Sequence, residues 1–320
     1  MTALFLRPGL TPRLELEERT GDASLREIAG KAGADEQPIE QDVSVLLHVS
    51  DMHFGAEDEP ALEALVKLAQ RERPQALVAT GDITQNAKPE EFAAAERFFG
   101  RLVVPHHLIV PGSHDLPAWY LLRRLVAPYA AFRDAFGDQL EPRLQSHSVW
   151  VAGLRTTRRW RHREGTLSEA QVLQTAQWLA KAPPGVLRVV AMHHPVAVAP
   201  ELDDGDGPDA LNNADFAVDT WARAGVHVVL SGHTHLPCFL RLNSSPTGAP
   251  GCAMPMWGVQ AGTAVSQHLR GQQPHSPHSL NLLRRVAATG WRMEQWTYAV
   301  ESGEFVMSDW LSLPTSSNVA

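Results

Sequence analysis

Apolar residues fall into short runs separated by polar loops from Val43 onward, whereas the preceding residues follow no such pattern. Residues 1–42 are charged, contain glycine and lack sustained periodicity, so we interpret them as an N-terminal extension. The pattern predicts a folded domain over residues 43–312 and a C-terminal tail over residues 313–320. The sequence leaves open whether the extension is a flexible tail, an oligomerisation arm or a cover for a functional site.

Runs of strand character and runs of helix character alternate along most of this domain. Apolar runs of strand length occur at Val43–Val49, Ala76–Thr80, His107–Val110, Val149–Ala152, Arg188–Met192 and Val226–Leu230. Apolar residues recur at helical spacing at Leu62 to Ala69, at Pro89–Phe99, after Ser168 and at Leu211–Ala224. Ser168 and Gln171 also have the spacing of a helix capping box. This alternation predicts an α/β fold.

The pattern changes after residue 235, where the helical period stops. Residues 236–310 alternate apolar with polar positions and include the aromatic side chains Trp257, Trp291, Trp296 and Tyr298. We expect mostly antiparallel strands here. The stretch Gly271–His278 is rich in Gln, Pro and His and is predicted to be a loop.

Composition narrows the class of protein. Of the 320 residues, 44% are hydrophobic and 20% are charged, which is typical of a globular protein. The formal net charge of -8 makes nucleic acid an unlikely partner. Cys238 and Cys252 are too few for a disulfide framework. Because no apolar run reaches the length of a membrane span or a signal peptide, we expect a cytoplasmic protein that is not bound to a membrane.

Residues of metal-binding type follow the predicted strands directly. They are Asp51, His53, Asp82, His114, Asp115, His193, His194, His233 and His235. Ligands of open α/β sheets bind at the carboxyl ends of the strands, so these side chains are expected to meet at one place. For each residue alone, a turn, a helix cap or a buried core histidine is the ordinary alternative; the combination favours a site.

Carboxylate oxygens and imidazole nitrogens are suited to Mn, Fe or Zn, and the sequence does not choose among these metals. If a carboxylate bridges two ions about 3.5 to 4 Å apart, the pair can bind phosphate oxygens and activate a water molecule. Asp82 is the natural bridge between two such ions.

The ordered motifs resemble the signature of the calcineurin-like metallophosphoesterases, which reads D-x-H, G-D, G-N-H-D/E, H and G-H-x-H. Here the motifs are Asp51-Met52-His53, Gly81-Asp82, Gly112-Ser113-His114-Asp115, His193 and Gly232-His233-Thr234-His235. The chain is most similar to the bacterial branch that hydrolyses cyclic nucleotides and glycerophosphodiesters.

The resemblance implies a four-layer α/β/β/α sandwich, with two mixed sheets flanked by helices and a binuclear metal centre. It assigns one ion to Asp51, His53, Asp82 and His235, and the other ion to Asp82, Ser113, His193 and His233. It makes His114 the group that assists the leaving oxygen, with Asp115 orienting it, while metal-activated hydroxide attacks the phosphorus of a small phosphodiester. A homodimer is expected only by analogy with the family.

Ser113 departs from the family signature, which has Asn at this position. A serine hydroxyl is a shorter and poorer neutral ligand than an amide, so the second ion is expected to bind weakly. This departure keeps open a metal-binding scaffold with weakened catalysis. A phosphomonoesterase or a nuclease-like enzyme also stays open beside a phosphodiesterase, because the loops that select the substrate are not readable from one sequence.

A basic run between Arg155 and Arg163 precedes the helix that begins after Ser168. A solvated loop is the ordinary interpretation of such a run. The alternative is a clamp for an anionic substrate, in which Arg158 and Arg159 bind phosphate oxygens.

Overall fold

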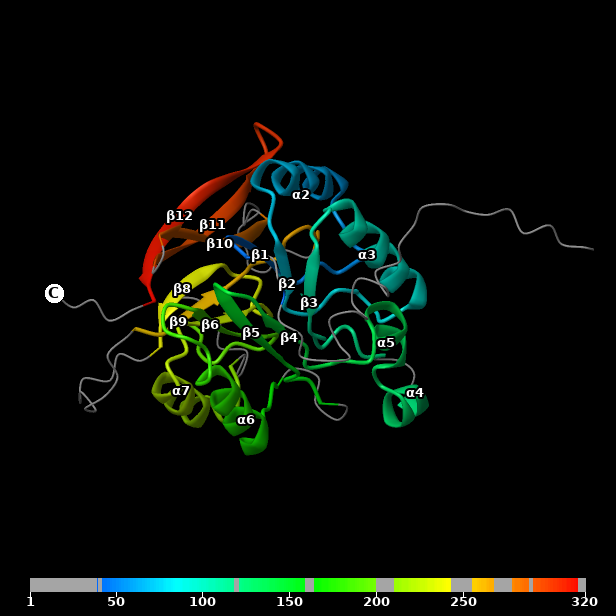
Figure 1. The fold of residues 1–320 in the computed structure, drawn as a ribbon. Coiled ribbons are helices and arrows are strands. Elements are labelled where there is room, and N and C mark those ends of the chain that lie inside the picture. Colours follow the sequence, from blue (N-terminus) through cyan, green and yellow to red (C-terminus); the bar gives the residue numbers. More distant parts are fainter. Residues whose placement is uncertain are drawn as a thin grey trace, which may run out of the picture.

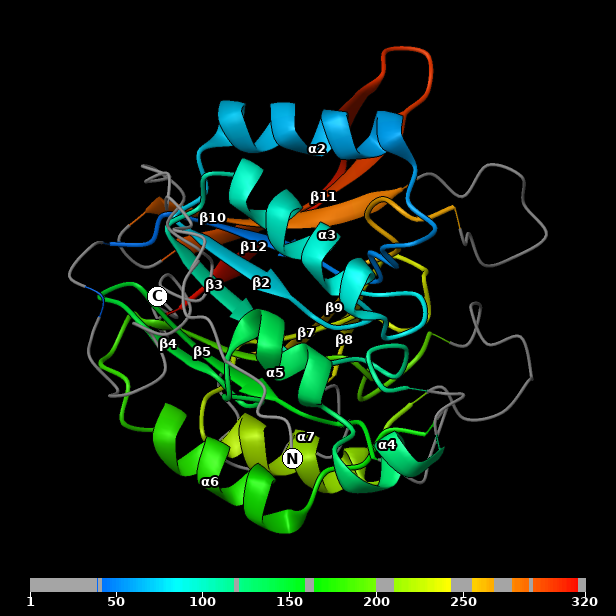
Figure 2. The same cartoon turned by 90° about the vertical axis from the view of Figure 1, so that its right-hand side faces the viewer.

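Two six-stranded sheets pack face to face, and helices cover their outer faces (Figures 1 and 2). The computed structural model describes residues 39, 42–117, 121–158, 164–199, 210–242, 255–267, 278–287 and 290–315. The layers follow the order helix, sheet, sheet, helix, so the predicted four-layer α/β sandwich is confirmed.

The first sheet joins the beginning of the domain to its end. Its strands are β1 (Val45–Val49), β2 (Ala76–Ala79), β3 (His106–Ile109), β10 (Ser279–Ala287), β11 (Gly290–Ala299) and β12 (Glu304–Pro314). Their order is β12-β11-β10-β1-β2-β3, in which β1, β2 and β3 are parallel and β10 pairs antiparallel with β1. β12 extends two residues into the segment that the sequence pattern set apart as a tail from residue 313.

The second sheet contains the middle of the chain. Its strands are β4 (Arg143–Gln145), β5 (Val149–Leu154), β6 (Leu187–Met192), β7 (Val228–Ser231), β8 (Cys238–Arg241) and β9 (Trp257–Gln260), in the order β4-β5-β6-β7-β9-β8. The strands after residue 235 pair mostly antiparallel, as expected, but β9 also pairs parallel with β7. The predicted loop at Gly271–His278 lies outside the described residues except for His278.

Helices cover each sheet on one side only. α2 (Glu59–Glu72) and α3 (Pro89–Arg101) pack on the first sheet, and α6 (Glu169–Leu179) and α7 (Ala214–Arg223) pack on the second. α6 begins with the predicted capping box, because Ser168 accepts a hydrogen bond from the backbone N–H of Gln171. The sequence pattern does not predict the short helices α4 (Leu121–Val126) and α5 (Ala130–Phe136), which span too few turns for a clear period.

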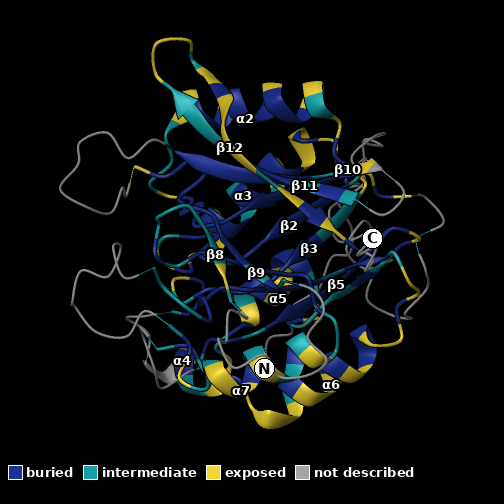
Figure 3. Ribbon diagram, turned by 90° about the vertical axis from the view of Figure 1, so that its left-hand side faces the viewer, coloured by how far each residue is buried: buried dark blue, intermediate teal, exposed yellow. Residues whose placement is uncertain are grey.

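Strand side chains alternate between the two faces of each sheet and so build separate cores. In β1, Leu47 and Val49 pack toward the helices, while Leu46 packs between the sheets. In β6, Val189 lies between the sheets and Val190 packs toward α6 and α7. Because both faces of the central strands are buried (Figure 3), their sequences are mostly apolar, with His48 in β1 and Arg188 in β6 as exceptions. Within the described residues, no helix is long and apolar enough to cross a membrane.

Candidate metal centre

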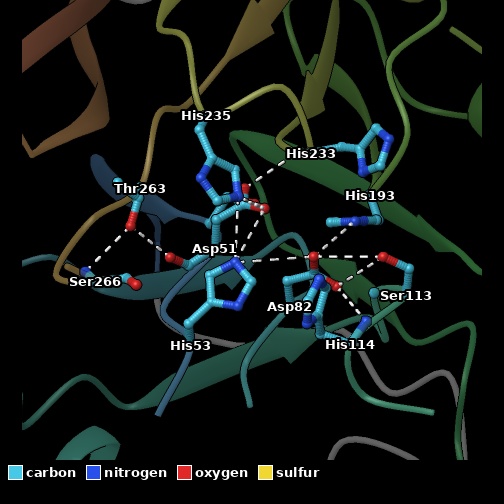
Figure 4. A network of polar contacts seen from close by, with 12 residues as sticks. Asp51, His53, Asp82, Ser113, His114, His193, His233, His235, Thr263 and Ser266 are labelled. Atoms are coloured by element: carbon cyan, nitrogen blue, oxygen red, sulfur yellow. Dashed lines mark hydrogen bonds and ion pairs between the residues drawn. The ribbon is translucent and has the colours of Figure 1, made fainter. Parts of the chain in front are cut away.

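The predicted ligands come together between the two sheets, at the carboxyl ends of their parallel strands (Figure 4). β1 and β2 of the first sheet lead to Asp51, His53 and Asp82. β6 and β7 of the second sheet lead to His193, His233 and His235. Because the strands of both sheets end on the same side of the molecule, residues far apart in the chain share one site.

The backbone is in the left-handed region at most of these positions. The φ angles are 51° at Asp51, 47° at His53, 48° at Asp82, 71° at His233 and 59° at His235. Residues with a Cβ atom rarely adopt this conformation, and such positions cluster at functional sites. Backbone hydrogen bonds hold the chain there: the N–H of Asp51 donates to the carbonyl of Gly81 (3.1 Å), and that of His53 to the carbonyl of Asp82 (3.0 Å).

One group of donors consists of Asp51, His53 and His235. The Nε2 atom of His235 lies 3.2 Å from Oδ1 of Asp51 and 3.2 Å from Nε2 of His53. The other carboxylate oxygen of Asp51 accepts the backbone N–H of His233 (3.0 Å). The Thr263 hydroxyl donates to the backbone carbonyl of Asp51 (2.7 Å). These contacts leave the side chains of all three residues directed at a common point (Figure 4).

A second group of donors surrounds Asp82. Its Oδ2 atom lies 3.4 Å from Nε2 of His193 and 3.9 Å from Nε2 of His53, so this carboxylate faces both groups. The ring of His193 is held by its Nδ1 atom, which donates to the carbonyl of Thr80 (2.9 Å). Ser113 contributes only a long contact, because its hydroxyl lies 3.4 and 3.5 Å from the two oxygens of Asp82.

Close approach of the backbone explains two of the glycines in the motifs. A Cβ atom on Gly232 would overlap the Ser50 hydroxyl and a carboxylate oxygen of Asp51. A Cβ atom on Gly112 would overlap the backbone nitrogen and a carboxylate oxygen of Asp82. Both glycines therefore let neighbouring loops press against the carboxylates.

The buried charges of the site perturb one another. Burial alone would raise the pKa of Asp51, but His235 lowers it to about 2. Burial likewise opposes ionisation of Asp82, yet His193 holds the pKa of this carboxyl well below its usual range. Burial alone would lower the pKa of His193, but the carboxylate of Asp82 raises it to about 9. Both carboxylates are thus anionic in the neutral pH range, and each requires a neighbouring cation.

These residues fit a pair of divalent cations. Overlapping groups of three donors, whose ligand atoms lie within 4.8 Å of one another, include Asp51-His53-His235 and Asp51-Asp82-His193. Oδ1 of Asp51 and Nε2 of His193 are buried, and beyond their ion-pair contacts with His235 and Asp82 they make no hydrogen bond within the described part of the chain. Cations would compensate the two buried carboxylates and displace the proton from His193. The donors are oxygen and nitrogen, which suit Mn, Fe or Zn without selecting one.

The family model of the calcineurin-like phosphoesterases matches residues 44–237, which is more than half of the chain. The chain belongs to the calcineurin-like phosphoesterase family. It is 34% identical over 88 residues to the glycerophosphodiester phosphodiesterase GpdQ of Enterobacter lignolyticus. That match covers 24% of this chain and 31% of the GpdQ enzyme, so the chain spans under a third of this curated relative.

Two solved structures share the phosphoesterase fold. The purple acid phosphatase PPD1 from yellow lupin (Lupinus luteus) has a TM-score of 0.63 at 11% identity, covering 88% of this chain and 55% of PPD1. PhoD has a TM-score of 0.59 at 12% identity, covering 88% of this chain and 71% of PhoD. At such low identity these likenesses show the fold alone.

The exposed His114 borders the donor groups. Its ring meets that of His53 edge to face, with centroids 4.8 Å apart, and its backbone N–H donates to Oδ1 of Asp82 (2.8 Å). The Nδ1 atom of His114 donates to the carbonyl of Gln85 (2.9 Å). Since Nδ1 carries this proton, Nε2 is the nitrogen available to a ligand or substrate.

Asp115 does not orient His114, contrary to the sequence-based expectation. Its carboxylate accepts the backbone N–H groups of Ile83 (3.2 Å), Thr84 (2.8 Å) and Gly112 (2.8 Å), together with the hydroxyl of Thr84. Burial and the charge of Asp82 raise the pKa of Asp115 to about 6. Asp115 therefore joins the loops after β2 and β3, and the carbonyl of Gln85 orients the His114 ring.

The basic run is only partly described. The guanidinium of Arg158 donates to the side chain of Gln171 (2.9 Å) and to the carbonyls of Arg155 (3.4 Å) and Thr157 (3.2 Å). This places Arg158 against the N-terminus of α6. Arg159 lies outside the described residues. Substrate binding by either arginine stays a prediction.

One supporting residue, His48, was not predicted because it belongs to no motif. It is buried in β1, between the hydroxyl of Thr80 (3.0 Å) and the amide of Asn281 (3.1 Å). The available signal was a histidine within an apolar strand, which is more often a core residue. His194, which the sequence did include among the candidates, contacts the hydroxyl of Thr156 through Nδ1 (2.7 Å).

Proposed function

We propose that this protein is a metal-dependent phosphodiesterase that hydrolyses a small phosphodiester. The proposal rests on one observation: two buried carboxylates and several imidazoles converge beside the exposed ring of His114 (Figure 4). The partial similarity to GpdQ supports a diester as the substrate. We also propose that Asp51, His53, Asp82 and His235 hold one cation, and that Asp82, His193 and His233 hold the other near Ser113.

When bound, such a cation pair stabilises the charge on phosphate oxygens and lowers the pKa of water. The protein residues supply position and proton control. The carbonyl of Thr80 accepts a hydrogen bond from the ring of His193, and the hydroxyl of Thr263 donates one to the carbonyl of Asp51. Both residues are thereby held in position. Asp82 faces both donor groups and would hold both ions.

His114 would deliver the proton that the leaving group needs. The Nδ1 proton of its ring is committed to the Gln85 carbonyl, so a second proton must sit on Nε2. As the bond from phosphorus to the leaving oxygen breaks and a bond to the attacking water oxygen forms, Nε2–H protonates the leaving alkoxide, and the proton that the water loses is released to solvent. The exposure of this ring, in contrast to the buried ligands, suits a group that meets the substrate.

The test compares two chromogenic esters with the full chain after chelation and reloading with Mn²⁺ or Fe²⁺. Bis-p-nitrophenyl phosphate is a diester, and p-nitrophenyl phosphate is the matched monoester. We expect metal-dependent turnover of the diester that exceeds turnover of the monoester at equal concentration. His147→Gln, a change at an exposed histidine on another part of the surface, is the control for loss of a histidine and should keep full turnover.

Preference for the monoester would replace this proposal with a phosphomonoesterase. Binding of metal with turnover of neither ester would favour a metal-binding scaffold, consistent with Ser113 at the position of the family asparagine. Either result would reject the phosphodiesterase.

A further inference from the structure

A third histidine lies against the ligands proposed for the second cation. His193, His194 and His233 form a group whose ligand atoms lie within 4.8 Å of one another. The ring centroid of His194 lies 4.5 Å from that of His233 and 4.9 Å from that of His193. His194 is buried, with 1% of its surface exposed. It belongs to no part of the family signature quoted above.

The end of β6 explains how adjacent residues reach one site. In a continuing strand, His193 and His194 would point to opposite faces of the sheet. β6 ends at Met192 and the chain bends at the two histidines, so their rings lie nearly perpendicular, at 81°. Gly165 packs against the ring of His194, where a Cβ atom would overlap it. The position of the ring is therefore set by its surroundings.

Both rings are supported in the same way. Nδ1 of His193 donates to the carbonyl of Thr80, and Nδ1 of His194 lies 2.7 Å from the hydroxyl of the buried Thr156. A partner at one ring nitrogen orients the other nitrogen toward a metal ion. In both rings that other nitrogen is a buried Nε2 atom.

Ser113 is a weak candidate ligand for the same ion. Its hydroxyl makes only long contacts with the Asp82 carboxylate, at 3.4 and 3.5 Å. A neutral hydroxyl is also a poorer donor to Mn, Fe or Zn than an imidazole.

We propose that His194 is a ligand of the second cation through Nε2, beside His193 and His233, and that Thr156 positions its ring. This inference rests on the metal centre of the proposed function and not on the substrate.

The test measures metal binding by the metal-free full chain. Isothermal titration with Mn²⁺ should give two ions per chain in the wild type. In His194→Gln, the first ion should bind with unchanged affinity and the second about tenfold to a hundredfold more weakly. Thr156→Val keeps the imidazole and should weaken the second ion by a smaller factor. His227→Gln replaces another buried histidine, at the start of β7, and should bind both ions as the wild type does.

Cobalt gives a second measurement that is independent of activity. The visible absorption of the second Co²⁺ ion reports its ligands, so its spectrum should change in His194→Gln while that of the first ion stays the same. Unchanged affinity and spectrum for the second ion would overturn the proposal, as would a wild type that binds a single ion. If His194→Gln does not fold, Thr156→Val decides by the same measurements.

Failure of this inference is distinguishable from failure of the phosphodiesterase. A wild type that binds two ions, loses the second in His194→Gln and hydrolyses neither ester would support the ligand and reject the activity.

Discussion

Individual residues of the candidate metal centre combine strained backbone with buried charge. Asp51 and Asp82 adopt left-handed φ angles and are almost fully buried. The strained backbone and the burial of a charge each cost free energy in isolation. The compensation is local: backbone groups fix each loop, and imidazoles face each carboxylate. The strain therefore lies where the ligands must be held in place. Variants of His114 and Ser113 test proton transfer and binding of the second cation separately.

Replacing His114 should impair proton transfer without loss of metal. His114→Gln is expected to lower kcat about 10²- to 10⁴-fold on a diester with an alkoxide leaving group, since that oxygen needs a proton. The loss of kcat should be much smaller for a diester with a p-nitrophenolate leaving group, which departs without a proton. Steady-state kinetics with both substrates and metal analysis check this. Because His114 also lies in a donor group with His53 and Asp82, loss of an ion would instead identify it as a ligand.

Ser113→Asn should tighten binding of the second cation. An amide oxygen reaches farther than the serine hydroxyl and is a better neutral ligand, so we expect an affinity gain of about tenfold, comparable to other changes around metal ligands. Titration of the metal-free protein gives both affinities. The control is Ser302→Asn in an exposed turn. Equal affinity for the second ion in all three proteins would contradict the expectation.

At the scale of elements, the loop between β9 and β10 braces the metal-binding loop after β1. The backbone N–H of Ala264 donates to the carbonyl of Ser50 (3.1 Å), and the hydroxyl of Thr263 donates to that of Asp51. The same hydroxyl accepts the N–H of Ser266 (3.1 Å). Residues more than 200 positions away in the chain thus hold Asp51 in its left-handed conformation. The first sheet in this way supports the ligands.

Thr263→Val tests this brace. The substitution keeps the shape of the side chain but leaves the buried Asp51 carbonyl without its hydroxyl donor, which should cost about 1 to 3 kcal/mol of unfolding free energy. Urea denaturation of the metal-free protein measures the loss, and metal titration should show weaker binding of the first ion. Thr297→Val, within β11, is the matched control. Wild-type stability and affinity would show that the brace does not contribute.

At the scale of the whole molecule, the two sheets place polar groups in an apolar interior. His227 lies at the start of β7, where its Nδ1 accepts the backbone N–H of Arg188 (3.0 Å). Burial, followed by the charge of Arg188, lowers its pKa to about 4. Burial also lowers the pKa of His107 to about 4 and that of His48 to about 3. The fold therefore favours neutral histidines at several points.

Acid should destabilise the protein through these histidines. The folded state disfavours the protonated form of His227, so its contribution is complete above the unfolded pKa of 6.5 and is lost as pH falls toward 4. Each such group adds a slope of at most about 1.4 kcal/mol per pH unit in this window. Stability of the metal-free protein, measured by urea denaturation between pH 7 and pH 4.5, should fall less steeply in His227→Gln. A His147→Gln variant with the same shallow slope would contradict this assignment.

The sequence by itself determined the family motifs and the local elements. Apolar periodicity located the central strands and main helices, because a strand buried on both faces needs a continuous apolar run. The capping box at Ser168 was readable because its two partners are three residues apart. The chain order of Asp51, His53, Asp82, His193, His233 and His235 predicted their convergence, since parallel strands end at one edge of a sheet.

Only the tertiary structure decided the contacts between distant segments. It gave β9 its parallel partner, Asp115 its backbone donors and His194 its place beside His233. Short helices such as α5 also depend on it, because Phe132 and Phe136 are stabilised by packing on Phe92 of α3 and not by helix propensity. The physical reason is the same throughout: local patterns record which face a residue buries, whereas its partner across the fold depends on how the chain brings separate elements together.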